Sequence, residues 1–256
     1  MKTPHNDVDF NALHDLFSFV LHPTIEKKSL PLSFGRKIEA VFQYMSVNLI
    51  LQLLLGSAIT FFLYYIDSQF GATTTNALTD FVKSSSYLSL LMLGGIVLPF
   101  LEEVGFRLPL HFHPLSLGIS LAYILVLLYS LVFPQPSSLG TNILVVIAIS
   151  LLIGGLCALL FYGKRDSIAL FWHRQFRWIY YSFAILFGCM HISNFSSPSI
   201  WVYLFTPLLI LPQFLSGLVL GYVRLQFGFF WGFAFHALWN SALLSLAYVV
   251  YTLIPV

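Results

Sequence analysis

Charged side chains are scarce in this sequence of 256 residues, at 9% of the chain, whereas soluble domains carry about 25%. Hydrophobic residues make up 58%, and the mean hydropathy is +0.86. This composition excludes an ordinary soluble domain, and a net charge of +2 is too small to favour nucleic acid as a partner. We therefore expect an integral membrane protein with the lipid bilayer as its surroundings.

Cysteine and several protease motifs are also scarce or missing. Cys157 and Cys189 both fall in apolar runs, where a thiol behaves as a small hydrophobic group, so no disulfide framework is expected. The chain has no His-Glu-x-x-His zinc helix, no Gly-x-Ser-Gly nucleophile of the rhomboid type and no Gly-x-Gly-Asp of the aspartyl type. Residues 1–37 lack the apolar region of a signal peptide, so the first span is expected to direct insertion.

The apolar runs predict an all-α fold, a polytopic bundle of transmembrane helices. Pro207 and Pro212 are expected to kink or split the sixth run, which makes seven spans or eight. The runs cover residues 38–66, 87–110, 115–133, 140–163, 178–197, 200–223 and 229–254.

Lys and Arg residues predict the orientation of the bundle. With seven spans and a cytoplasmic N-terminus, eleven of the twelve basic residues fall on the inner side and only Lys83 falls outside. Because basic residues are enriched in cytoplasmic loops, this arrangement is favoured, and the cytoplasmic (plasma) membrane is the expected location.

The segment before the first span is predicted to form a short amphipathic helix. Its apolar residues recur at helical spacing, and Pro23 ends the pattern. The helix is expected to lie on the inner membrane interface or to pack on the bundle. We thus divide the chain into an N-terminal cytoplasmic segment, 1–37, and a transmembrane domain, 38–256. The apolar residues are Phe10, Leu13, Leu16, Phe17, Val20 and Leu21.

Two adjacent carboxylates in the second run are the strongest functional signal. Glu103 and Arg107 are separated by four residues, so they are expected to pair on one face of a helix. Glu102 points about 100° away and is expected to face the bundle interior as a general base. A helix end with solvated charges at the inner interface is the alternative.

Three polar residues in later runs are candidate partners for Glu102. His191 lies four residues after Phe187, whose ring is expected to pack against the imidazole. His236 and Asn240 share one helix face and are expected to aim two donors at one point, as an oxyanion hole requires. A satisfied core histidine and an interhelical polar pair are the corresponding alternatives.

Together these residue types supply the parts of amide hydrolysis, a water activated by Glu and His and donors for the oxyanion. Glu102, His191 and His236 are also candidate ligands for a divalent metal such as Zn²⁺, since one carboxylate and two imidazoles form a known open site. The sequence does not choose between a zinc-bound and a metal-free water.

The three motifs, in this order, resemble the CPBP family, the CAAX prenyl protease and bacteriocin-processing proteins. The resemblance covers roughly 88–240, and the glycine-containing stretch 212–240 is similar to the family's third region. The motifs are Glu102-Glu103-x-x-x-Arg107, Phe187-x-x-x-His191 and His236-x-x-x-Asn240.

The resemblance implies an intramembrane CAAX-type endopeptidase, labelled a metalloprotease or a glutamate protease, acting on a peptide or protein that is lipid-modified or unmodified. Glu102 and His191 would activate water, His236 and Asn240 would stabilise the oxyanion, and Glu103 and Arg107 would support them. One departure is spacing, because 89 positions separate Glu102 from His191 where the family has a short connection. An even number of added spans preserves helix direction, so the site can still close.

Two other classes of function fit the same residues. One is a non-catalytic membrane protein, such as an immunity or resistance factor, that binds a partner through this scaffold. The other is a small transporter with a Glu–His proton relay.

The expected depth of the residues in the membrane is a second difficulty for the endopeptidase site. Glu102 and His236 are expected toward the inner side and His191 somewhat past the middle of the bilayer.

Overall fold

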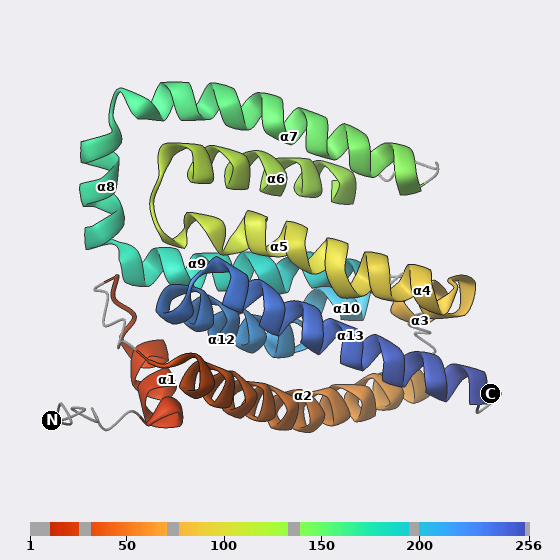
Figure 1. Cartoon of the computed structure of the whole chain (residues 1–256). Helices are drawn as coiled ribbons and strands as arrows, with labels where there is room; N and C mark the ends of the chain where they lie inside the picture. The colour runs from red at the N-terminus through yellow and green to blue at the C-terminus, as the bar shows by residue number, and fades with distance from the viewer. Residues whose placement is uncertain (1–10, 26–31, 71–76, 133–138, 195–199, 254–256) are drawn as a thin grey trace, which may run out of the picture.

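The computed structural model describes residues 11–25, 32–70, 77–132, 139–194 and 200–253, and within them every regular element is a helix (Figure 1). Two elements are short 3₁₀ turns, η2 and η3, and one, η1, is a π-helix. In chain order they are α1 Ala12–Leu21, α2 Phe34–Phe70, α3 Ala77–Ser84, α4 Tyr87–Ser89, η1 Leu90–Val97, α5 Leu98–Phe106, η2 Leu108–Leu110, α6 Pro114–Val132, α7 Leu139–Tyr162, α8 Arg165–Arg174, α9 Phe176–Met190, η3 His191–Asn194, α10 Ile200–Leu204, α11 Thr206–Leu209, α12 Leu211–Phe227 and α13 Phe229–Leu253.

The all-helical prediction is confirmed, and each of the seven apolar runs coincides with helix in the described residues. By length and composition, three of these helices can cross a membrane, Phe34–Ser68, Tyr87–Leu110 and Phe229–Thr252. A fourth is added if α7 and α8, which meet at a bend of 95°, count as one broken span. The chain is therefore a helical membrane protein, with fewer helices passing this test than the seven spans expected.

Proline explains why the sixth run is not one long helix. Pro207 and Pro212 each lie in the first turn of a helix, α11 and α12, where the missing N–H costs nothing. The run is therefore divided at Phe205 and Ile210, as the two prolines predicted. The piece that remains, α12, has 17 residues.

Five segments form the core of the bundle: α2, η1 with α5, α9, α12 and α13. Helix α12 packs against α9, α13 and α2, and α13 packs against both η1 and α5. Gly228, with φ of +99°, links α12 to α13 in a backbone conformation that residues other than glycine rarely adopt. The two helices thus return antiparallel and close one side of the core.

Close packing of α9 on α12 depends on two glycines. A Cβ added at Gly217 would lie 3.2 Å from Phe187 Cδ1 and 3.3 Å from the Cα of Ala184. A Cβ added at Gly188 would lie 3.3 Å from the Ile210 carbonyl oxygen. Small residues at these positions let the helix backbones approach.

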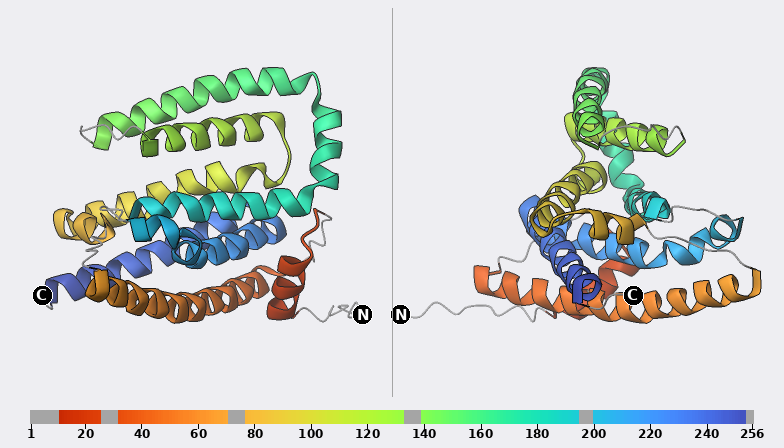
Figure 2. Two further views of the ribbon diagram at one scale, coloured as in Figure 1. Left: turned by 180° about the vertical axis from the view of Figure 1, so that it is seen from behind. Right: turned by 90° about the vertical axis from the view of Figure 1, so that its right-hand side faces the viewer.

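The residues between α5 and α9 form a hairpin at the edge of the molecule. Helices α6 and α7 lie side by side, and α6 reaches the core through α5, while α8 crosses the end of the bundle and leads into α9 (Figures 1 and 2). Because the hairpin contributes an even number of helices, the chain re-enters beside α5, and α5 and α9 are in contact. The long spacing between the first two motifs is accommodated in this way.

The N-terminal amphipathic helix is α1, and it packs on the bundle, the second of the two expected positions. It contacts α12 and α2, and its Leu16 is 2% exposed. Asn11 caps its start by accepting a hydrogen bond from the His14 backbone N–H at 3.1 Å. Two helices that the sequence reading had not anticipated are α3 and α8, both short segments between apolar runs.

Candidate functional site

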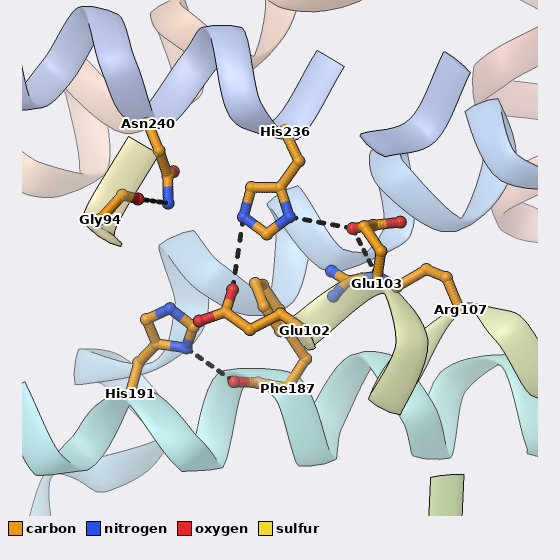
Figure 3. A network of polar contacts seen from close by, with 8 residues as sticks. All are labelled: Gly94, Glu102, Glu103, Arg107, Phe187, His191, His236 and Asn240. Carbon is orange, nitrogen blue, oxygen red and sulfur yellow. Dashed lines mark hydrogen bonds and ion pairs between the residues drawn. The ribbon is translucent and has the colours of Figure 1, made fainter. Parts of the chain in front are cut away.

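A cavity of about 360 Å³ lies within the core, between α2, η1, α5, α9, α12 and α13. Glu102, His191, His236 and Asn240 all line it, although 138 positions separate the first from the last. Figure 3 shows the four side chains converging from three helices, with the Glu102 carboxylate directed toward the His191 ring. The expected mismatch in depth is therefore removed by the packing of the helices.

Glu103 and Arg107 form the predicted pair on α5. Arg107 Nε lies 3.6 Å from Glu103 Oε1, and the two side chains are 2% and 0% exposed. Glu102, on the neighbouring face, is 21% exposed and lines the cavity. The alternative of a solvated helix end is wrong for Glu103, since its carboxylate is enclosed by protein.

His236 lies between the two carboxylates (Figure 3). Its Nδ1 donates a hydrogen bond to Glu103 Oε1 at 2.9 Å, and its Nε2 lies 3.4 Å from Glu102 Oε2. With Nδ1 protonated, a lone pair on Nε2 would repel the Glu102 carboxylate, so the contact is favourable when a proton lies between them.

His191 sits where α9 ends. Its backbone N–H bonds to the carbonyls of Gly188 and Cys189, and its ring Nδ1 lies 2.8 Å from the Phe187 carbonyl oxygen. A carbonyl only accepts, so Nδ1 is the donor and caps an acceptor that the helix end leaves free. In the neutral ring, Nε2 then keeps its lone pair on the cavity side of the molecule.

Phe187 contacts His191, His236 and Arg107 through its ring. It packs edge-on against His191 with ring centroids 4.6 Å apart, as predicted, and against His236 at 5.9 Å. The guanidinium carbon of Arg107 lies 3.8 Å from the centre of the same ring, a favourable cation–π geometry. The sequence reading missed this stacking, because no local pattern connects Arg107 with a helix that starts 69 positions later.

Asn240 is positioned by the π-helix. Its Nδ2 donates to the Gly94 carbonyl oxygen at 3.4 Å. That carbonyl has no donor in its own helix, since the Leu98 N–H bonds to Leu93 and the next residue, Pro99, has no N–H. An amide NH₂ carries two protons, so one N–H of Asn240 is left for the cavity.

Only one of the two residues expected to form the oxyanion hole has a free N–H. His236 has Nδ1 committed to Glu103 and Nε2 facing Glu102, so it presents no spare N–H to the cavity, whereas Asn240 retains one. The reason is that both glutamates of the first motif, rather than one, lie within reach of the same imidazole.

The residues proposed as metal ligands are not arranged as a three-ligand site. Throughout the described part of the chain, no three His, Cys, Asp or Glu side chains are grouped so that they could hold a metal ion. His191 Nδ1 and His236 Nδ1 are used by Phe187 and Glu103, which leaves Nε2 as the ring atom that a metal could use. Glu102, His191 and His236 thus lie on one cavity without the grouping that a three-ligand site needs.

Besides Asn194 of η3, four polar residues of the cavity wall were missed by the sequence reading. They are neutral and come from α2 and α12, and a signal was present, because they repeat at helical spacing within apolar runs. They are Asn48, Gln52, Gln213 and Ser216.

No family model, no curated protein and no solved structure matches this chain. We therefore infer function from the geometry of the cavity and the chemistry of its residues.

Proposed function

We propose that this protein is an intramembrane endopeptidase that hydrolyses a peptide bond with a water activated by Glu102 and His191. The observation that carries the proposal is the convergence of Glu102, His191, His236 and Asn240 on one cavity. A carboxylate, an imidazole with a free lone pair and an amide donor are the groups that amide hydrolysis needs. The CPBP-like motifs supply these same residues, and membership of that family is part of the proposal.

The proposed reaction starts with the shared proton on His236, which leaves Glu102 as a carboxylate. Glu102 takes a proton from a water that also donates to His191 Nε2, and the water oxygen bonds to the substrate carbonyl carbon. The free N–H of Asn240 donates to the resulting oxyanion. The C–N bond then breaks, and the leaving amine takes the proton from Glu102, which gives a carboxylic acid and an amine.

Glu103, Arg107 and Phe187 act as positioning residues in this scheme. Glu103 orients the His236 ring, Arg107 compensates the Glu103 charge, and Phe187 holds the rings of both histidines. No step of the proposed reaction uses zinc.

The same proposal includes the topology, seven spans with a cytoplasmic N-terminus, in the cytoplasmic membrane. It is supported by the charges at the ends of the bundle, because α8 and the start of α2 share one end, and α3, with Lys83, lies at the other (Figure 1). The substrate is then a peptide segment or a lipid-linked peptide near the cytoplasmic half of the bilayer.

The test is Glu102→Gln, which keeps the volume and removes the base. Membrane fractions of cells that express the protein are compared by mass spectrometry for new peptide N-termini, with the exposed Glu39→Gln on α2 as a matched control. We expect the new termini to vanish with Glu102→Gln and to persist with Glu39→Gln.

Two results would contradict the proposal. A biological activity that survives both Glu102→Gln and His191→Ala would favour the non-catalytic, partner-binding alternative. Uptake driven by a pH gradient, without peptide products, would favour a transporter that uses the Glu102–His236 contact as a relay.

A further inference from the structure

We propose that the neutral wall of the cavity, formed by Asn48, Gln52, Gln213 and Ser216, binds the backbone of an apolar peptide through its C=O and N–H groups. We call these four residues the amide wall. This inference rests on the proposed function, because it names the substrate group that the site would hold. It concerns binding and not the chemical step.

The amide wall is a hydrogen-bonded ladder between two helices. Gln52 Nε2 donates to the Pro212 carbonyl oxygen at 2.8 Å and to Ser216 Oγ at 2.7 Å. Ser216 Oγ in turn donates to Asn48 Oδ1 at 2.7 Å. These bonds fix the orientation of the Asn48 amide, since its oxygen is the end that accepts.

Two atoms of the wall lack a partner among the described residues. Asn48 Nδ2, a donor, and Gln213 Oε1, an acceptor, are buried without a hydrogen bond, and Asn48 is 1% exposed. An unpaired buried polar atom is costly, so a free donor and a free acceptor on one cavity wall indicate a ligand that supplies both complements. A peptide backbone does so, through its C=O and N–H groups.

The rest of the cavity restricts the class of ligand. The amide wall carries no charge, which disfavours an ionic ligand there. Much of the remaining lining is apolar and includes Leu98, Leu220, Leu243 and Phe81. An apolar peptide, with polar backbone groups and hydrocarbon side chains, matches both parts of this surface.

Gln52 lies between the cavity and the outside of the bundle. Besides lining the cavity, it lines an open groove on the surface of α2 with Leu53, Gly56, Thr60 and Tyr64. Leu53 and Tyr64 are 60% and 73% exposed. A peptide that lies against α2 therefore meets the amide wall when it enters the cavity.

The experiment measures binding without hydrolysis, in full-length protein carrying Glu102→Gln. The probes are acetyl-leucyl-leucine methylamide and the matching depsipeptide, in which the central amide N–H is replaced by oxygen. Binding is followed by the fluorescence of Trp239, which lines the cavity, and Trp239→Phe identifies its signal.

We call the Glu102→Gln protein the parent. We expect it to bind the amide probe about fivefold more tightly than the depsipeptide, which is an ester, and this is the effect of one neutral hydrogen bond. Gln213→Met should bind both probes about equally, because it removes the acceptor for the N–H. Asn48→Leu, combined with Ser216→Ala so that no hydroxyl loses its acceptor, should weaken the amide about fivefold and keep the preference for it. Gln43→Met, on the exposed side of α2, should match the parent.

Equal binding of the two probes by the parent would overturn the inference, and so would an undiminished preference in Gln213→Met. The comparison on the parent needs no substitution in the wall, so it stands even where a variant fails to fold. Amide-selective binding without any hydrolysis by the wild type would overturn the proposed function alone. Hydrolysis with no amide preference would overturn only the amide wall.

Discussion

His236 Nδ1 lies 2.9 Å from Glu103 Oε1, and this hydrogen bond ties α13 to a fully buried carboxylate on α5. The same ring faces Glu102 through Nε2. One imidazole thereby sets the position of both glutamates, and the buried charges form a unit whose members depend on each other.

Removing the cation of the buried pair should destabilise the protein. Arg107→Met leaves the Glu103 charge with His236 alone, and breaking a buried pair costs about 3–5 kcal/mol in the free energy of unfolding. Denaturant unfolding in detergent checks this. The double variant Glu103→Gln, Arg107→Met should recover part of the loss, and Arg165→Met, in an exposed pair with Asp166, should change little. An Arg107→Met protein as stable as the wild type would contradict the burial of the pair.

Loss of the amide donor should slow the reaction without stopping it. Asn240→Ala removes the one free N–H assigned to the oxyanion, and such donors are worth about 10² to 10³ in kcat. The rate is measured on a cleaved peptide with KM determined separately, since the donor acts mainly in the transition state. Thr252→Val, exposed on the same helix, is the control. A fall in affinity alone, at unchanged kcat, would assign Asn240 to substrate binding.

Chelation should leave activity unchanged. Because Glu102, His191 and His236 are not grouped for a metal among the described residues, we expect the purified protein to retain activity in 1,10-phenanthroline. Elemental analysis by mass spectrometry should find no stoichiometric zinc. One zinc per chain, lost together with activity and restored with it, would show that the side chains rearrange to bind metal.

Enlarging a glycine between α9 and α12 should disturb both stability and the site. A Cβ at Gly217 meets the Cα of Ala184 at 3.3 Å, so Gly217→Val forces the backbones apart, at a cost of about 1–3 kcal/mol. Because α9 carries Phe187 and ends at His191, activity should fall as well. Gly155→Val, inside α7 and with no atom within 4 Å of its Cβ, is the control. Equal effects at the two positions, measured by thermal unfolding and cleavage rate, would count against this packing.

Local features of the sequence determined much of this protein. The apolar runs located the helices, Pro207 and Pro212 located the breaks in the sixth run, and the spacing of Glu103 and Arg107 predicted their pairing. These features depend on helical periodicity and on the cost of burying polar groups, which act over a few residues and can be read along the chain.

Contacts between distant helices were decided by tertiary structure alone. The two-sided contact of His236, the stacking of Arg107 on Phe187 and the amide wall all depend on the register at which α2, α5, α9, α12 and α13 meet. That register is set by close packing at glycines and by the π-helix before Pro99, which leaves the Gly94 carbonyl to Asn240. A shift of one residue along a helix turns a side chain by about 100°, so composition and spacing within single helices could not have predicted it.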